Sequence, residues 1–148
     1  MSGEVLIKDI KNCEYFRALD NSSLCELLQV AKDKEARCSV SSVSLAHAIV
    51  KPGETTLPHK LKTSAEVYFI LEGAGRMKIE DETAEVRPGQ AVYIPPNSRQ
   101  CIQNTGSSDL KFLCVVSPMW RKEDDCFLSS TRTNLGQGKV ETKNENED

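Results

Sequence analysis

The residues best suited to chemistry are one histidine and one glutamate, His59 and Glu66, on two neighbouring predicted strands between Gly53 and Gly73. Side chains alternate along a strand, so two antiparallel strands can hold an imidazole and a carboxylate on one face. Such a pair is a common partial ligand set for a borderline divalent metal. It can equally act as a catalytic acid and base, because histidine titrates near neutrality and burial raises the pKa of a carboxyl group.

A companion stretch from Gly89 to Asn104 repeats the order of turn, strand, turn and strand, and it contributes Gln100. An amide at this position can orient a substrate or serve as a weak third metal ligand, since neutral glutamine binds these metals poorly. The alternative for His59, Glu66 and Gln100 is an interior hydrogen-bonded group without a catalytic role. A carboxylate inside a barrel is costly unless it is paired or coordinated, which favours a role for Glu66.

The elements that must position these residues are short strands separated by turns. From residue 41 onward, turns rich in proline and glycine punctuate alternating apolar segments, and no helical segments alternate with them. That pattern is typical of an all-β sandwich or barrel. The predicted strands are 43–50, 55–61, 66–71, 76–79, 84–86, 91–94, 99–104 and 110–116, with a four-residue hairpin loop at 80–83.

The two ends of the chain differ from this central barrel, which we place at residues 41–125. Residues 1–40 form an N-terminal arm, in which 4–10 could be a short edge strand. Residues 24–30 fit either a helix opened by a capping box at Ser23 or a strand that covers the barrel. Residues 126–148 have little to bury and are predicted to be a flexible polar tail.

The strand that follows Glu66 has two apolar faces. If His59 and Glu66 point inward, Tyr68 points inward too, and Phe69 lies on the outer face with other apolar residues. A strand of this kind is buried on both sides. The arm, a second subunit or a strand swapped from that subunit must cover it, so we expect a homodimer. The same alternation turns His47 outward, and Trp120 is expected to pack against the barrel end.

Composition limits the partners. The 148 residues suit a single domain, and the net charge of −3 gives no basic field for nucleic acid or an anionic membrane. No apolar run reaches the roughly 20 residues of a membrane span, and the start lacks a signal-peptide core, so a cytoplasmic protein is expected. The six cysteines show no C-x-x-C spacing and are expected to be free thiols.

The two stretches together resemble the paired motifs of the cupin superfamily. The first motif has a glycine, a His-x-His pair, a glutamate and a closing glycine. Gly53, His59, Glu66 and Gly73 match it, while Leu61 stands where the family has its second histidine.

In the second motif Gly89, Pro95 and Asn104 match, while Asn97 replaces a glycine and Gln100 replaces the histidine. The resemblance covers about residues 44–125. Its departures fall on the positions that bind metal in the family.

The resemblance implies a jelly-roll barrel of about six to eight strands, usually dimeric, with a small-molecule site inside. Typical members bind Fe, Mn, Ni or Zn through four residues. Leu61 has no donor atom, so one divalent metal would be held by His59, Glu66 and Gln100, with water completing the shell. The predicted substrate pocket is lined by Leu61, Tyr68, Phe112, Cys114 and Val116.

Family enzymes include dioxygenases, sugar isomerases and epimerases, and lyases. Oxidative chemistry usually keeps two or three histidines on iron, whereas isomerisation or elimination needs a Lewis acid and a base. The retained pair therefore favours an isomerase- or lyase-like enzyme with catalytic His59 and Glu66. One alternative is a metal-free, non-catalytic protein that binds or senses a metabolite, which the apolar Leu61 supports. Two others are a metal-dependent dioxygenase and a scaffold with a vestigial pocket.

Overall fold

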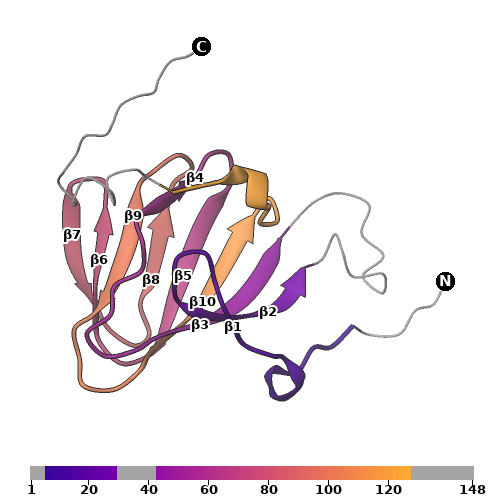
Figure 1. Cartoon of the computed structure of the whole chain (residues 1–148), viewed down its shortest axis with the longest axis horizontal. Helices are drawn as coiled ribbons and strands as arrows, with labels where there is room; N and C mark the ends of the chain where they lie inside the picture. Colours follow the sequence, from indigo (N-terminus) through magenta and orange to yellow (C-terminus); the bar gives the residue numbers. More distant parts are fainter. Residues whose placement is uncertain (1–5, 30–42, 128–148) are drawn as a thin grey trace, which may run out of the picture.

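The structure is a computed structural model that describes residues 6–29 and 43–127, and these form two antiparallel sheets (Figure 1). The first sheet has six strands in the order β1-β2-β3-β10-β5-β8 and the second has five in the order β11-β4-β9-β6-β7. The strands of the first sheet are β1 (Phe16–Arg17), β2 (Ser23–Gln29), β3 (Ser44–Val50), β10 (Leu110–Ser117), β5 (Ala65–Glu72) and β8 (Ala91–Ile94). Those of the second are β11 (Asp125–Phe127), β4 (His59–Leu61), β9 (Gln100–Asn104), β6 (Gly75–Ile79) and β7 (Glu82–Val86).

The core lies between the two sheets and draws on both. Ile70 of β5 and Phe112 of β10 meet Met77 of β6 and Ile102 of β9, each at most 3% exposed. Every second residue of these strands is buried, which is the alternation expected when one face of each sheet packs on the other. The predicted all-β jelly-roll architecture is confirmed.

Most of the predicted strands of the barrel agree with the structure to within a residue or two. The predicted strand 55–61 is reduced to His59–Leu61, because Pro58 has no amide hydrogen to donate to a ladder. Thr55 makes only an isolated bridge to Gln103. The predicted four-residue hairpin loop is also wrong: Ile79 pairs with Glu82, so the turn contains only Glu80 and Asp81.

A glycine fixes the turn that ends β5. Gly73 has φ of +91°, and a Cβ placed there would lie 2.6 Å from the backbone oxygen of Asp109. Only glycine tolerates both the backbone conformation and this close approach. The motif glycine therefore sets the end of the strand that carries Glu66.

The N-terminal arm adds strands to the first sheet. Of the two alternatives for residues 24–30, the strand is right: β2 pairs antiparallel with the edge of β3, with Leu24 opposite Ala48. That edge satisfies the backbone hydrogen bonds of both strands, which outweighs a local capping signal. The described part of the predicted edge strand 4–10 is not a strand, and it leads into a short 3₁₀ helix at Ile10–Asn12.

At the other end, β11 continues to Phe127, two residues past the predicted boundary of the barrel. The rest of the predicted polar tail lies outside the described residues, as do residues 1–5 and 30–42. None of the described residues forms a helix long and apolar enough to cross a membrane.

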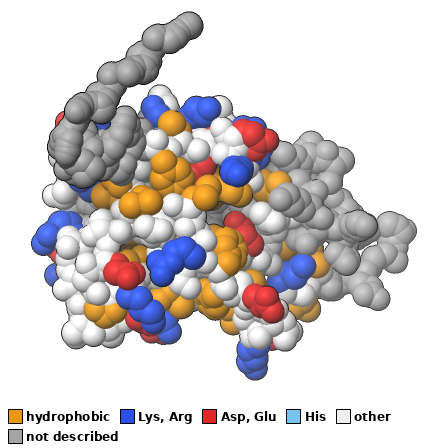
Figure 2. Space-filling view, in the orientation of Figure 1, with side chains coloured by type: hydrophobic (Ala, Val, Ile, Leu, Met, Phe, Trp, Pro, Cys, Tyr) orange, Lys and Arg blue, Asp and Glu red, His pale blue; other side chains and the backbone are white. Residues whose placement is uncertain are grey.

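Among the described residues, the N-terminal arm covers the outer face of the first sheet on one side only. His47 of β3 points outward as predicted, but it is only 8% exposed, because the Tyr15 hydroxyl lies 2.7 Å from its Nδ1. On β5 and β8, Phe69, Leu71 and Tyr93 remain 40%, 37% and 60% exposed. On the side of the molecule seen in Figure 2, acidic and basic side chains are interspersed, with hydrophobic side chains between them.

Candidate functional site

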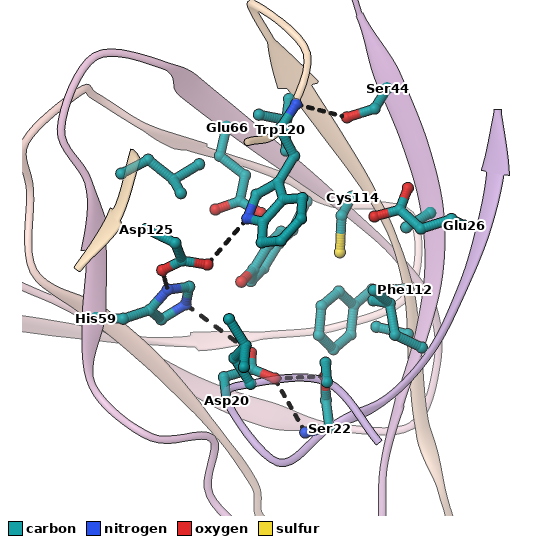
Figure 3. A pocket seen from close by; sticks show the side chains of 18 of the residues that line it. Asp20, Ser22, Glu26, Ser44, His59, Glu66, Phe112, Cys114, Trp120 and Asp125 are labelled. Carbon is teal, nitrogen blue, oxygen red and sulfur yellow. Dashed lines mark hydrogen bonds and ion pairs between the residues drawn. The ribbon is translucent and has the colours of Figure 1, made fainter. Parts of the chain in front are cut away.

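A cavity of about 300 Å³ lies between the two sheets (Figure 3). Its walls come from β2, β3, β5 and β10 of the first sheet, from β4 and β11 of the second, and from the loop between β1 and β2. The structure places the two predicted catalytic residues, His59 and Glu66, on its wall. All five residues of the predicted substrate pocket line it as well, namely Leu61, Tyr68, Phe112, Cys114 and Val116.

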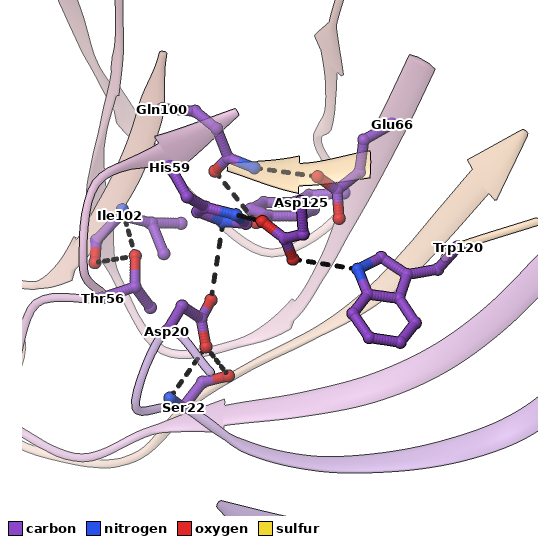
Figure 4. A network of polar contacts seen from close by, with 10 residues as sticks. Asp20, Ser22, Thr56, His59, Glu66, Gln100, Ile102, Trp120 and Asp125 are labelled. Carbon is purple, nitrogen blue, oxygen red and sulfur yellow. Dashed lines mark hydrogen bonds and ion pairs between the residues drawn. The ribbon is translucent and has the colours of Figure 1, made fainter. Parts of the chain in front are cut away.

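The imidazole of His59 is held in one orientation by its surroundings. Its Nδ1 lies 2.6 Å from Oδ1 of Asp125, and the indole N–H of Trp120 donates to Oδ2 of the same carboxylate at 2.9 Å (Figure 4). The ring of Phe127 stacks on the imidazole with centroids 4.9 Å apart and an interplanar angle of 9°. Because a carboxylate only accepts, the ring proton of neutral His59 sits on Nδ1, which leaves Nε2 as an acceptor.

That Nε2 atom is buried and has no hydrogen-bond partner among the described residues. Oδ2 of Asp20 lies 3.8 Å away across the cavity, too far for a hydrogen bond. Burial opposes a charge on His59, but the hydrogen bond and charge of Asp125, with the charges of Asp20 and Glu66, outweigh it and raise the pKa of the imidazole. A buried atom without a partner at a cavity wall is the usual place for a ligand contact.

Glu66 is held by a second set of hydrogen bonds. The amide nitrogen of Gln100 donates to Oε1 of Glu66 at 2.8 Å, and the amide oxygen of Gln100 accepts from the Tyr68 hydroxyl at 3.1 Å. Burial raises the pKa of Glu66 to about 8, with His59 opposing the shift and Asp20 adding to it. Burial therefore favours the protonated form of Glu66 near neutral pH.

Of the three predicted metal ligands, Glu66 and Gln100 are hydrogen-bonded to each other, whereas Nδ1 of His59 lies 2.6 Å from Asp125. The amide nitrogen of Gln100 donates to Glu66 and its oxygen accepts from Tyr68. The amide oxygen, the atom that would bind a metal, is therefore already engaged. Leu61, where the family has a histidine, lines the cavity with an apolar side chain. Among residues 6–29 and 43–127, no three His, Cys, Asp or Glu side chains form a group that could hold a metal ion. These residues do not fit the metal centre that the resemblance implies.

Two site residues near the C-terminal end were missed by sequence reasoning. Trp120 lines the cavity and binds Asp125, rather than serving only to close the barrel end. Asp125 follows two other acids, and nothing in that run distinguishes it. Its neighbour Asp124 has a separate task, because its carboxylate accepts from the backbone amides of Thr63 and Ser64 at 2.8 and 3.1 Å.

Asp20 was also missed. It lies in the loop between β1 and β2, where its Oδ1 accepts from the amide and the hydroxyl of Ser22 at 3.0 and 2.7 Å. The backbone oxygen of Asp20 accepts from the amide of Leu57 at 2.9 Å, which ties the loop to the segment before β4. The Asp-Asn-Ser sequence signals a turn, but only the tertiary structure places that turn over the cavity.

Sequence comparison supports the family. The sequence model of a protein family described as "Cupin domain" matches residues 46–116. An uncharacterized protein of Methanocaldococcus jannaschii is 48% identical over 85 residues, which are 57% of this chain and 68% of that protein. An oxalate-binding protein of Thermotoga maritima is 31% identical over 65 residues, covering 44% of this chain and 54% of its own length. A mannose-1-phosphate guanylyltransferase of Salmonella typhimurium is 28% identical over 88 residues, covering 60% of this chain and 18% of that enzyme.

Solved structures share the fold. A predicted oxalate decarboxylase of Thermotoga maritima superposes with a TM-score of 0.65 at 22% identity, over 78% of this chain and all of that one. A nucleoside dehydratase from Streptomyces gives 0.65 at 15% identity, over 86% and 97% of the two chains. With both motif stretches, the two-sheet barrel and the central cavity in agreement, the chain belongs to the cupin superfamily.

Proposed function

We propose that this protein is an enzyme of isomerase or lyase type that moves a proton on a small organic substrate without a resident metal. The observation that carries the proposal is Nε2 of His59, a buried acceptor at the cavity wall whose ring is fixed by Asp125. A cavity of about 300 Å³ is at the lower end of the size range of small-molecule sites.

His59 would act as the general base in its neutral form, and its raised pKa makes that base stronger but less populated at a given pH. With Nδ1–H donating to Asp125, Nε2 can take a proton from a carbon or hydroxyl of the substrate. The imidazolium that forms is stabilised by Asp125 at 2.6 Å and by Asp20 at 3.8 Å. This is the role that a carboxylate plays for a catalytic histidine elsewhere: it orients the ring and balances the new charge.

Glu66 would act as the general acid. A carboxyl group with a pKa of about 8 holds its proton at pH 7 and can donate it to a leaving oxygen or to a neighbouring carbon. Gln100 and Tyr68 fix the orientation of that carboxyl group. Removal of a proton by His59 and delivery of one by Glu66 amounts to elimination or isomerisation. Such chemistry fits these residues better than iron-dependent oxidation, which needs ligands they do not provide.

A second candidate is a non-catalytic barrel that holds a metabolite. Leu61 favours it, because an apolar wall replaces the metal-binding histidine beside His59. In this case the same acceptor atom would bind a substrate hydroxyl without moving its proton.

Exchange of substrate hydrogen with solvent separates the two candidates. A panel of small hydroxy, keto and amino compounds is incubated with the protein in D2O and followed by proton NMR. We expect deuterium incorporation or turnover with wild type, at least a hundredfold slower with His59→Gln. The matched control is His47→Gln, because His47 is the other histidine of the sequence and lies on the outer face of the sheet, away from the cavity.

Exchange that persists in His59→Gln, or that requires added metal, would contradict the proposed role of the base. Binding without any exchange, in wild type and both variants, would favour the metabolite-binding protein.

We also infer a homodimer. The exposed residues Phe69, Leu71 and Tyr93 form an apolar strip on β5 and β8, next to the part of the sheet that the arm covers. A second copy of the chain that packed on this strip would bury the outer apolar face of β5, whose inner face already lies in the core.

A further inference from the structure

The charged groups of the cavity differ from those expected for an anionic ligand. The described residues that line it include Asp20, Glu26, Glu66 and Asp125, with His59 as the one basic side chain and no lysine or arginine. Proteins that bind carboxylates or phosphates in buried sites normally supply arginine, lysine or a metal to balance the charge. Here an anion would be buried against acids.

The acids do not all remain available to a ligand. Both oxygens of Asp125 are used, one by His59 and one by Trp120. Glu66 is protonated at neutral pH and bonded to Gln100. Asp20 is different, because Ser22 occupies only its Oδ1. Its Oδ2 points toward His59 across 3.8 Å, and the Asp20 side chain is 14% exposed.

A second observation concerns the nitrogen that faces Asp20 across the cavity. His59 is 94% buried, being 6% exposed, and its Nε2 has no hydrogen-bond partner among the described residues although it points at this space. In Figure 3, Asp20, His59, Phe112 and Trp120 surround the same opening. The cavity thus holds a carboxylate oxygen, Oδ2 of Asp20, and facing it a buried nitrogen, Nε2 of His59, which has no hydrogen-bond partner among the described residues and forms an ion pair with Asp20 when it is protonated.

The rest of the wall suits a cation with a hydrocarbon body. Four aromatic side chains line the cavity, namely Phe16, Tyr68, Phe112 and Trp120. The rings of Tyr68 and Phe112 lie against each other with centroids 4.5 Å apart. Aromatic rings attract cations through their negative faces and also accept apolar carbon, so they suit both parts of an organic amine.

We propose that the ligand of this cavity is a small organic cation, a protonated amine whose ammonium group binds Oδ2 of Asp20 and whose carbon skeleton lies against the aromatic wall. The inference deepens the proposed function by naming the substrate class of the same site, but it concerns binding rather than proton transfer. It also separates this chain from relatives named for oxalate or for mannose 1-phosphate, since both of those compounds are anions.

Three probes of nearly equal size and shape test the charge preference: cyclohexylammonium, cyclohexanol and cyclohexanecarboxylate. Their affinities for the full chain are measured by calorimetry and NMR at neutral pH. We expect cyclohexylammonium to bind at least about tenfold more tightly than cyclohexanol, and cyclohexanecarboxylate not to bind. In Asp20→Asn the advantage of the ammonium over the alcohol should fall about tenfold. The matched control is Asp81→Asn at the exposed β6–β7 turn, which should change nothing.

Equal or tighter binding of the carboxylate, a preference for the alcohol, failure of the ammonium to bind, or an unchanged preference in Asp20→Asn would each overturn the proposal. If Asp20→Asn does not fold, the ranking of the three probes on wild type still decides. The proposed catalysis is judged separately, because His59→Gln should abolish exchange while keeping the preference for the cation. If wild type itself catalyses no exchange but still prefers the cation, only the proposed function is contradicted.

Discussion

The chemistry of the site depends on which atoms of a few side chains remain available after packing. His59 has one nitrogen committed to Asp125 and one directed into the cavity. Glu66 has its orientation fixed by Gln100 and its proton held by burial. The adjacent aspartates 124 and 125 do different work, since Asp124 supports the backbone at Thr63 and Asp125 supports the imidazole.

The first prediction separates these two aspartates. In Asp125→Asn, the negative charge that raises the pKa of His59 is lost, and the one amide oxygen can accept from only one of His59 and Trp120, so the pKa falls below its wild-type value and exchange activity drops about a hundredfold. In Asp124→Asn, the hydrogen bonds to residues 63 and 64 weaken and the free energy of unfolding falls by about 1–3 kcal/mol. NMR titration of the imidazole and denaturant unfolding measure the two effects. A fall in the pKa of His59 in the Asp124 variant alone would contradict the assignment.

The second prediction concerns pH and Glu66. Its pKa rises from 4.5 to about 8 on folding, so between these values the folded state holds a proton that the unfolded state has released. The free energy of unfolding therefore falls as pH rises through this window. His59 contributes in the same direction above its unfolded value of 6.5, because its pKa is also raised.

Unfolding of wild type and Glu66→Gln at about pH 5 and about pH 8 checks this. We expect the loss of stability between the two pH values to shrink by about 3 kcal/mol in the variant, which has no proton to lose at this position. A stability that rises with pH in wild type, or the same slope in both proteins, would show that Glu66 ionises normally.

At the scale of elements, two short pieces complete the site. Strand β11 brings Asp125 and Phe127 beside β4, and the loop between β1 and β2 brings Asp20 over His59. Strand β4 is only three residues long, yet it presents His59 and Leu61 to the cavity and Lys60 to the other face. A substitution at residue 61 therefore alters the cavity, whereas a substitution at residue 60 does not.

The third prediction uses that alternation. Leu61→His places a second imidazole on the cavity side of β4, two residues from His59, and restores the His-x-His pair that the family uses for metal. We expect elemental analysis after exposure to Zn, Mn, Fe or Ni to find little metal in wild type and close to one ion per chain in the variant. Lys60→His, on the opposite face, is the control and should gain none. Stoichiometric metal in wild type that His59→Ala removes would instead support the three-ligand site of His59, Glu66 and Gln100.

At the scale of the whole molecule, the two sheets leave one apolar strip uncovered by the described residues. The N-terminal arm covers His47 of β3, while Phe69, Leu71 and Tyr93 of β5 and β8 stay exposed. On the face seen in Figure 2, acidic and basic side chains are interspersed.

The fourth prediction is therefore that the protein dimerises through this strip. Sedimentation equilibrium should give a dimer for wild type and a monomer for Phe69→Lys, because a lysine in the strip would have to be buried without a partner. Thr83→Lys, on the exposed edge strand β7, is the control and should remain a dimer. A monomeric wild type would contradict the predicted homodimer.

The sequence by itself determined the barrel and half of the site. Alternation from His59 and Glu66 put Leu61 and Tyr68 on the inside, the family resemblance placed Phe112 there, and the glycines and prolines marked most strand ends. These features are local, since a strand's two faces and a turn's conformation depend on residues near in sequence. The spacing of the two motifs then indicated the family.

Only the tertiary structure decided what the polar residues can do. Asp20 belongs to the N-terminal arm and Asp125 to the C-terminal end of the barrel, 105 positions later, and they meet around His59 because the arm and β11 fold back over the same opening. Whether a carboxyl group keeps its proton depends on burial and on charges brought from distant strands, as for Glu66. No periodicity in a single chain encodes such contacts, because they are set by how the strands are ordered in the sheets.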